Sequence, residues 1–368
     1  MRFPEFSGEW KMCTIGELIT KVGSGVTPRG GEAVYKTEGH PFVRSQNVGL
    51  GNLLLDDIAF IDEETHLRQK NTELQFNDVL LNITGASIGR SALVDKQIVG
   101  GNVNQHVCII RTKENLVPSF ICSFLLSNYG QRQIDSFQAG GNRQGLNFEQ
   151  IKSIKITIPS KDEQIKIAKL LRAIDERIAT QNKIIDKLQS LIKGIAQNVA
   201  RNNKPNIRLS ECLECSSSTL QESDVCKNGT YPVYGANGIV GYLDNYNTEK
   251  EAVYIIKDGS GVGTVSYVTG KCSATGTLNT LQAKEGYSLQ YLYYMLKVFN
   301  FEPYKTSMAI PHIYFKDYGK AKIFCPSYTE QLKYARLLSA IDNKLSAEQS
   351  ILTDLSLQKQ YLLRQMFI

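Results

Sequence analysis

The sequence lacks any long hydrophobic run, and no stretch approaches the roughly 18 apolar residues that a membrane-spanning helix needs. Its start, MRFPEFSGEW, contains no apolar core of the kind found in secretory signals, so we expect a cytoplasmic protein. The 368 residues are 42% hydrophobic and 21% charged, which excludes intrinsically disordered and collagen-like classes. At about 100–200 residues per domain, this length predicts two or three domains.

The sequence also lacks catalytic and cofactor motifs. It has no GxxxxGK[S/T] phosphate loop, no His-Glu-x-x-His zinc motif and no Asn/Asp-Pro-Pro-aromatic motif of amino-methyltransferases. Gly259, Gly261 and Gly263 come nearest to a dinucleotide loop, but a strand-like run follows them instead of a helix, which favours a β-turn. We therefore expect a non-catalytic chain that binds no cofactor.

Cysteines and histidines give no sign of a metal or nucleophilic site. The eight cysteines include one close pair, Cys212-x-x-Cys215, and a zinc site would have to recruit Cys226 and Cys272 at irregular spacing. Free thiols are the favoured interpretation, so no metal is expected. His106 lies in a polar cluster with no identified Ser or Cys partner, which is typical of an ordinary surface residue.

Positive charge is concentrated in one segment. The chain carries 42 basic and 36 acidic residues, a net charge of +6, which permits a nucleic-acid partner without requiring one. Residues 1–158 are neutral overall, whereas residues 159–203 carry 9 basic and 5 acidic residues.

The chain repeats itself at an offset of 167 residues. Pro159–Leu188 and Pro326–Leu355 align without a gap, and 13 of the 30 positions are identical. In both copies apolar residues recur at alternating spacings of four and three, which predicts long helices with a coiled-coil seam. Gln181 and Glu348 interrupt the seam at the same point of each copy, and Lys359 interrupts the second seam once more.

The segments before the helices also correspond. Each contains an apolar strand, a Gly-x-x-x-Gly turn and a second strand that reaches Val94 or Val268. Helix-like apolar runs follow at Ser119–Leu126 and Leu289–Leu296. We therefore expect α+β domains in the order domain, helix, domain, helix, with boundaries at 1–158, 159–203, 204–325 and 326–368.

Connectivity constrains the helices. The first helix, from about Asp162 to Ala200, would be ~58 Å long. Only Arg201–Asn206 separate it from the second domain, so the second helix must run back antiparallel if the seams pack. This predicts an intramolecular antiparallel coiled coil with a pseudo-two-fold repeat and one domain at each end.

Polar turn segments of the domains carry amides, hydroxyls and arginines, which suit base and phosphate contacts in DNA. Solvated turns are the alternative for any one loop. The candidate DNA-binding residues are Arg29, Arg44, Gln46, Asn47, Thr84, Ser87, Arg90, Asn104, Gln105, Asn142, Arg143, Tyr234, Asn237, Lys257, Ser260, Asn279, Lys305, Ser307 and His312.

The repeated helical motif resembles that of the specificity subunits of type I restriction–modification systems. Pro159–Asp175 and Pro326–Asp342 carry the resemblance, which extends over essentially the whole chain. It implies that each domain reads one half of a split, asymmetric site in double-stranded DNA. It also implies that the helices set the spacer and dock two modification (methyltransferase) subunits, and that restriction (endonuclease) subunits join the complex.

The family motif assigns six candidate partner-binding residues on the helices: Glu163, Gln164, Asp175, Glu330, Gln331 and Asp342. The alternative function is a non-catalytic coiled-coil adaptor with two protein-binding domains. An adaptor for two equal partners should keep its two domains alike, whereas these domains differ in their loops.

Overall fold

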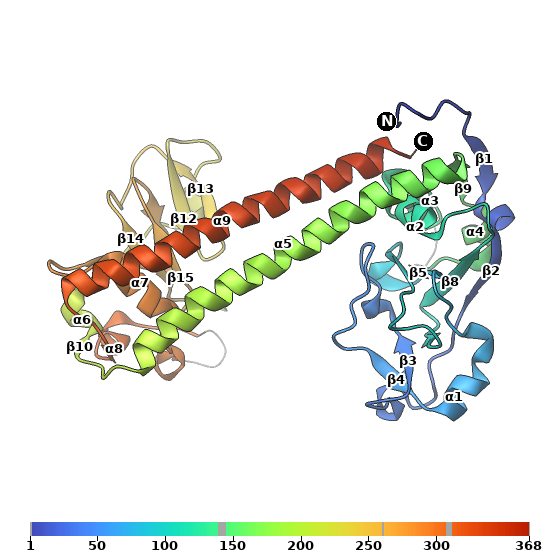
Figure 1. The fold of residues 1–368 in the computed structure, drawn as a ribbon. Coiled ribbons are helices and arrows are strands. Elements are labelled where there is room, and N and C mark those ends of the chain that lie inside the picture. The colour runs from blue at the N-terminus through green and yellow to red at the C-terminus, as the bar shows by residue number, and fades with distance from the viewer. Residues whose placement is uncertain (1, 139–144, 260, 307–310, 368) are drawn as a thin grey trace. The chain divides into compact units, whose positions relative to one another are not determined.

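The structure is a computed structural model that describes residues 2–138, 145–259, 261–306 and 311–367 (Figure 1). The chain divides into two compact units. Unit 1 comprises Met1–Gln181 and Ile351–Ile368, and unit 2 comprises Asn182–Ser350. Each unit therefore contains one β-rich part and a portion of both long helices.

Unit 1 is built on a four-stranded antiparallel sheet in the order β2-β8-β5-β6. Unit 1 also contains a three-stranded sheet in the order β4-β3-β7 and a two-stranded sheet in which β1 pairs with β9. The strands are β1 Lys11–Thr14, β2 Ile19–Ser24, β3 His40–Val43, β4 Ala59–Ile61, β5 Val79–Asn82, β6 Ser91–Leu93, β7 Asn102–Val103, β8 Val107–Thr112 and β9 Lys155–Ile158.

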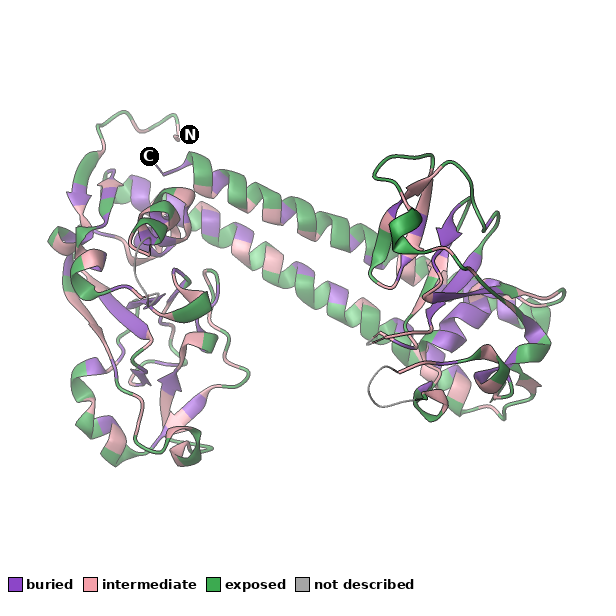
Figure 2. Ribbon diagram, turned by 180° about the vertical axis from the view of Figure 1, so that it is seen from behind, coloured by how far each residue is buried: buried purple, intermediate pink, exposed green. Residues whose placement is uncertain are grey.

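Central strands of unit 1 are buried on both faces, which explains their continuous apolar sequence. All four residues of β5 are buried, as are the first four of β8, and α2 covers one face (Figure 2). The helices of this part are α1 Glu63–Arg68, α2 Pro118–Leu126, α3 Asn128–Ser136 and α4 Phe148–Ser153.

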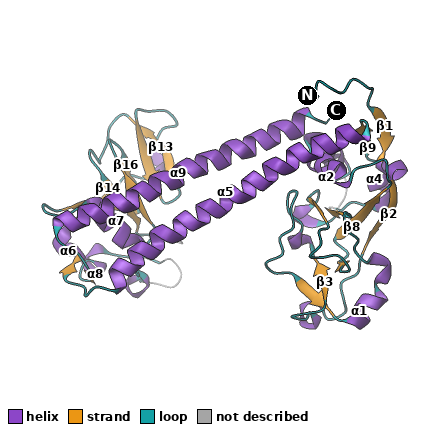
Figure 3. Cartoon of the chain, in the orientation of Figure 1, coloured by secondary structure: helices purple, strands orange, loops and turns teal. Residues whose placement is uncertain are grey.

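Unit 2 repeats this topology. Its four-stranded sheet has the order β11-β17-β14-β15, its three-stranded sheet the order β13-β12-β16, and β10 pairs with β18. Figure 3 distinguishes the strands, in orange, from the helices, in purple. The strands are β10 Ile207–Arg208, β11 Leu213–Ser217, β12 Tyr231–Gly235, β13 Gly238–Leu243, β14 Ala252–Ile256, β15 Val265–Val268, β16 Ser273–Ala274, β17 Leu278–Ala283 and β18 Lys322–Ile323. The short helices are α6 Leu209–Cys212, α7 Leu289–Lys297 and α8 Phe315–Tyr318.

The long helices are α5 Lys161–Arg201 and α9 Tyr328–Gln365, close to the expected bounds. They pack together: the start of α5 meets the end of α9 in unit 1, and the reverse holds in unit 2, so the pairing is antiparallel. The seam is buried as the heptad pattern predicts, with Ile167, Leu171 and Ile174 in α5 and Leu338 and Leu362 in α9 each less than 9% exposed. The expected α+β class with two long packed helices is confirmed.

No helix in the described ranges of the chain is both long and apolar enough to cross a membrane.

Candidate nucleic-acid interface

Loops from several strands meet at one edge of unit 1. The end of β2 lies beside the start of β8, where Ser24 pairs with Cys108, and the end of β5 lies beside the same point, where Asn82 pairs with Val107. The backbone N–H of Gly25 donates to the carbonyl of Asn104, the residue that follows β7 (3.3 Å). The three-stranded sheet therefore reaches the same edge. We call residues 25–31, 44–47, 84–90 and 104–106 the unit 1 edge.

A side-chain network connects three loops of the unit 1 edge. The backbone N–H of Thr27 donates to Gln105 Oε1 (2.9 Å), so the Gln105 amide nitrogen faces His106 Nε2 (3.1 Å) as a donor. His106 Nε2 is then the acceptor, and Nδ1 carries the proton that faces Thr84 Oγ1 (2.6 Å). The sequence predicts an ordinary surface residue at His106, whereas in the structure its ring links two candidate residues, Thr84 and Gln105.

Cations of the unit 1 edge fall into two groups. Arg29 and Arg90 are exposed, and neither forms an ion pair within the described ranges. The side chain of Arg44 is 13% exposed and pairs with Glu32 (3.6 Å) and Asp57 (3.3 Å). Arg29 and Arg90 are therefore open to solvent, whereas Arg44 is engaged within the unit.

Several polar candidates of this edge hold the loops in place. Asn47 is fully buried and donates to the carbonyl of Leu54 (2.8 Å), and buried Asn104 accepts from the backbone N–H of His106 (3.0 Å). Ser87 Oγ accepts from the Asn82 amide (3.1 Å), while the exposed Gln46 bonds to Asp57.

The corresponding edge of unit 2 forms in the same way. The end of β11 and the start of β17 meet where Ser217 pairs with Asn279, and β14 ends there, with Ile256 opposite Leu278. We call residues 218–221, 236–237, 257–259, 275–277 and 312 the unit 2 edge. An isolated bridge joins Asp258 to His312, just as Thr84 is bridged to Gly145 in unit 1.

Different side chains occupy the unit 2 edge. Lys257 is half-buried and forms no ion pair within the described ranges, and Asn237 is exposed at the β12–β13 turn. His312 Nδ1 lies 2.5 Å from Asp258 Oδ1, and Lys305 pairs with Glu302 (2.5 Å).

Two further unit 2 candidates pack against other side chains, Asn279 buried and Tyr234 half-buried. Asn279 is 3% exposed and bonds to Ser217 Oγ (3.1 Å) and to the Tyr318 hydroxyl (3.1 Å). Tyr234 contacts the ring of Tyr254 (5.8 Å between centroids), and burial raises the pKa of its hydroxyl. The structure thus brings together candidates from different loops, and their contact with DNA stays a prediction.

Four candidates lie outside the described residues. They are Asn142, Arg143, Ser260 and Ser307.

The duplicated glutamines of the helical motif bind the same feature in each unit. Gln164 Oε1 accepts the backbone N–H of Val117 (2.9 Å), the residue that caps α2. Gln331 Oε1 accepts the backbone N–H of Ser288 (2.9 Å), the residue that caps α7. Both glutamines are at most 2% exposed, so their side chains join the long helices to the β-rich parts.

The acidic residues of the motif differ more. Glu163 is fully buried and forms a bidentate ion pair with Arg2 (both 2.8 Å), whereas Glu330 is exposed and accepts from Ser327 Oγ (2.8 Å). Asp175 pairs with Lys359 (2.5 Å), and Asp342 accepts from the Tyr294 hydroxyl (3.2 Å). Their contact with a partner also stays a prediction.

The cysteines are spread through both units. Six of the eight are buried, Cys215 is half-buried, and Cys226 is exposed. Burial raises the pKa of Cys108 and Cys212 to about 12 and that of Cys215 to about 11. No group of three or more His, Cys, Asp or Glu side chains in the described ranges is placed to hold a metal ion.

Known proteins share this sequence pattern and this fold. The model of the type I restriction modification DNA specificity domain matches residues 7–190 and 205–356. A putative type I specificity subunit from Mycoplasma genitalium is 24% identical over 315 residues, which cover 79% of this chain and 81% of the relative. The EcoKI specificity subunit from Escherichia coli is 22% identical over 202 residues, which cover 52% of this chain and 41% of that relative.

Solved structures agree with this assignment at the level of the fold. The crystal structure of a type I restriction–modification S subunit from M. genitalium superposes with a TM-score of 0.68 at 18% identity, covering 100% of this chain and 97% of that one. A structure from a study of complex assembly and conformational transition of the type I system has a TM-score of 0.56 at 16% identity and covers 98% and 97% of the two chains. Since the family model spans most of the sequence, the chain belongs to the type I restriction–modification specificity subunits, the non-catalytic subunits that give such systems their DNA specificity.

Proposed function

We propose that each edge reads one half of a bipartite DNA site, and that α5 and α9 set the spacing between the halves. The observation that carries the proposal is the shared topology of the two edges, which presents different side chains in the two units. The unit 1 edge offers Arg29, Arg90 and the His106 network, whereas the unit 2 edge offers Lys257 and the Asp258–His312 pair. Two different readers on one framework suit an asymmetric site.

The sharpest test compares one cation from each edge that forms no ion pair within the described ranges, the exposed Arg90 and the half-buried Lys257. Arg90→Gln should relax sequence preference in one half-site, and Lys257→Gln should affect the other half-site alone. An arginine that contacts a guanine contributes ~1–3 kcal/mol at one base pair, whereas a phosphate contact weakens all sequences alike. Mapping of methylated adenines in the assembled complex reads out both halves.

Matched controls are exposed lysines on strands of other sheets, Lys155→Gln on β9 and Lys322→Gln on β18. They should leave both half-sites unchanged. If Arg90→Gln altered the half-site assigned to unit 2, or if neither edge variant changed DNA recognition, the modular proposal would be wrong.

We also propose that the helices dock two modification subunits and that restriction subunits join this complex on DNA. Ile184 and Ile351 occupy equivalent positions of the repeat, yet they are 36% and 42% exposed. Apolar side chains at the same place in both copies suit two copies of one partner. Because Ile184 belongs to unit 2 and Ile351 to unit 1, each copy would have its own contact.

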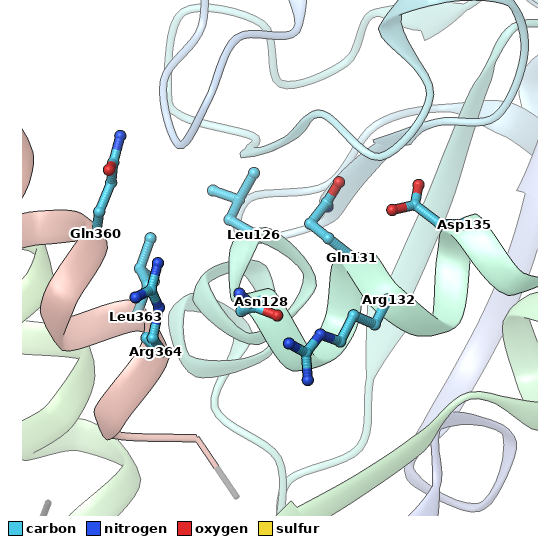
Figure 4. A pocket seen from close by; sticks show the side chains of 8 residues that line it. All are labelled: Leu126, Asn128, Gln131, Arg132, Asp135, Gln360, Leu363 and Arg364. Carbon is cyan, nitrogen blue, oxygen red and sulfur yellow. The ribbon is translucent and has the colours of Figure 1, made fainter.

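Grooves beside the helices support the docking proposal. In unit 1, a cavity of about 330 Å³ lies between the α2–α3 segment and α9, with Leu126 and Leu363 among its apolar walls and Arg132 and Arg364 among its charged ones (Figure 4). In unit 2, a cavity of about 460 Å³ lies between α7 and the helices, lined in part by Lys193 and Lys297. Each lining also contains one carboxylate, Asp135 in unit 1 and Asp342 in unit 2. Apolar walls with charged rims suit an amphipathic segment of a partner.

Ile184→Glu and Ile351→Glu should each remove one modification subunit, and the double variant should remove both. Native mass spectrometry of the co-purified complex measures the stoichiometry. Asn182→Asp, an exposed polar residue on the same helix, is the control. Full assembly of the double variant would refute this docking surface.

A further inference from the structure

The duplicated Gln and Asp of the helical motif form contacts in both units, and the Gln contacts the same element in each. They are eleven residues apart in both copies, Gln164 to Asp175 and Gln331 to Asp342. Eleven residues of α-helix make about three turns and ~16 Å, so both side chains leave the same face of the helix. A nine-residue helix, α2 or α7, is ~13 Å long and fits between them.

The Gln end forms the same two hydrogen bonds in both units, and Gln164 additionally donates to the carbonyl of Asn115 (3.2 Å). In each, the side-chain oxygen accepts the backbone N–H of the residue that caps the nine-residue helix, and the amide nitrogen donates to a carbonyl at the start of the long helix. That carbonyl belongs to Pro159 in unit 1 (3.1 Å) and to Pro326 in unit 2 (2.9 Å). A buried amide with both ends satisfied fixes where α2 and α7 begin.

The Asp end differs between the units. In unit 2, the Tyr294 hydroxyl on α7 donates directly to Asp342, and Tyr294 is only 2% exposed. In unit 1, Lys359 of α9 pairs with Asp175 and also donates to the carbonyl of Leu50 (3.1 Å). The repeat equivalent of Lys359 is Ile192, so the charge that interrupts the second seam has no counterpart in the first copy.

The Lys359–Asp175 pair lies against a loop that leads into the unit 1 edge. A Cβ on Gly51 would stand 3.4 Å from both Asp175 Oδ2 and Lys359 Nζ, so there is little room at this point. The backbone N–H of Gly51 donates to the carbonyl of Ser91 (2.9 Å), next to the candidate reader Arg90. The loop therefore contacts the helix pair on one side and the residue after Arg90 on the other.

The pair also lies close to α2. Burial raises the pKa of Cys122 on α2 to about 11, and Lys359 and Asp175 act on this thiol with opposite signs. Leu126, the last residue of α2, lies 3.6 Å from the same Cβ position of Gly51. The Asp end of the motif is thus placed beside the end of α2, as the Gln end is placed at its start.

We propose that the Gln–Asp pair of each repeat is a two-point clamp that sets the angle between a recognition domain and the long helices. In unit 1 the clamp is completed by Lys359 and Leu50, and in unit 2 by Tyr294. Gln164, Asp175, Gln331 and Asp342 are then positioning residues. The link to DNA spacing rests on the proposed function, whereas the clamp itself is a property of the free chain.

The first experiment measures hydrogen exchange of the full-length free chain. Lys359→Met keeps an apolar stem of similar length in the seam but removes the ion pair and the bond to Leu50. Exchange at residues 48–54 and at Arg90–Ser91 should accelerate by about tenfold, because a local contact that stabilises the loop is lost. Asp175→Asn should do the same, and the double variant should add little.

Arg172→Gln is the matched control, because it breaks an exposed ion pair with Glu176 on the same helix, one turn from Asp175. Its exchange pattern should equal that of the unaltered chain. Tyr294→Phe should accelerate exchange around α7 in unit 2 and leave residues 48–54 unchanged. Equal exchange in Lys359→Met and Arg172→Gln would overturn the clamp.

The second experiment uses the assembled complex and duplexes in which the spacer of the mapped site is one base pair shorter or longer. Lys359→Met should lower the preference for the correct spacer by about tenfold while both half-site sequences stay unchanged. A purely structural defect would instead weaken every duplex alike, and this result would overturn the positioning role. If the unaltered chain showed no spacer preference, the proposed function would fail, while the exchange data would still decide on the clamp.

Discussion

Gly25 lies where the four-stranded and three-stranded sheets of unit 1 approach each other closely, because it follows β2 and lies against Val103 of β7. A Cβ built on Gly25 would lie 1.7 Å from the carbonyl oxygen of Val103 and 2.8 Å from its carbonyl carbon. Real Cβ atoms stay at least 3.0 Å from such atoms, so Gly25→Ala must open the backbone by about 1 Å. The hydrogen bond from Gly25 to Asn104 (3.3 Å) is lost in the process.

The cost follows from these two effects. Overpacking against backbone costs ~1–3 kcal/mol and the lost hydrogen bond adds ~1 kcal/mol, so unit 1 should lose about 3 kcal/mol of unfolding free energy. For a unit of this size, its melting temperature should fall by about 6–12 °C. The same shift separates residues 25–31 from 104–106, so methylation mapping should show relaxed reading of one half-site.

Gly23→Ala is the control, because nothing lies within 4 Å of a Cβ at Gly23, which is in β2 two residues earlier. Alanine there should be neutral or stabilise the strand by ~0.5–1 kcal/mol. Urea unfolding of the free chain and mapping in the complex measure both variants. If Gly25→Ala matched Gly23→Ala in stability and in half-site reading, close backbone packing would not organise this edge.

Three further outcomes are expected. Asp78→Asn should cost unit 1 about 3 kcal/mol in urea unfolding, because Asp78 is buried and accepts two bonds of 2.7 Å from Arg111, whereas Arg68→Gln, at an exposed pair, should be neutral. Burial raises the pKa of Cys108 from 9.0 to about 12, so the unfolded chain ionises first as pH rises above 9. Unfolding free energy should then fall by ~1.4 kcal/mol per pH unit up to pH 11 through this thiol, and Cys108→Ala should remove that part of the slope. Insertion of four residues after Gln181 and after Glu348 lengthens each helix by ~6 Å and turns it by ~40°, so methylation mapping should show a spacer one base pair longer with unchanged half-sites; an unchanged spacer would show that the helices do not set the distance.

Periodic and duplicated features of the fold could be predicted from the sequence. The seam from Ile167 to Val199 and its repeat fix two long helices, because a spacing of four and three has no other regular interpretation. The Gly-x-x-x-Gly turns at Gly85 and Gly259 also separate the expected strands, since both glycines adopt positive φ angles of 72° and 95°.

The candidate site was less accessible from sequence because it depends on contacts between distant segments. The heptad pattern shows that Lys359 interrupts the apolar seam. It does not show that Lys359 donates to the carbonyl of Leu50, which is 309 residues away in the sequence. The family motif predicts that Gln164 and Gln331 bind a partner, which stays a prediction, and the structure adds that both form hydrogen bonds inside their own unit. In each bond a backbone N–H donates to the glutamine side-chain oxygen. Every residue type except proline carries a backbone N–H, so the sequence does not reveal which one is bound.

The distribution of thiols makes the chain a natural target for site-specific labelling. Cys226 is exposed in unit 2, whereas the thiols of unit 1, Cys13, Cys108 and Cys122, are all buried. At neutral pH a maleimide dye should therefore attach to native Cys226 with no cysteine removed, because six thiols are buried and burial raises the pKa of the half-buried Cys215 to about 11. A fluorophore at that position would report on DNA arriving at one recognition domain while the other stays unlabelled.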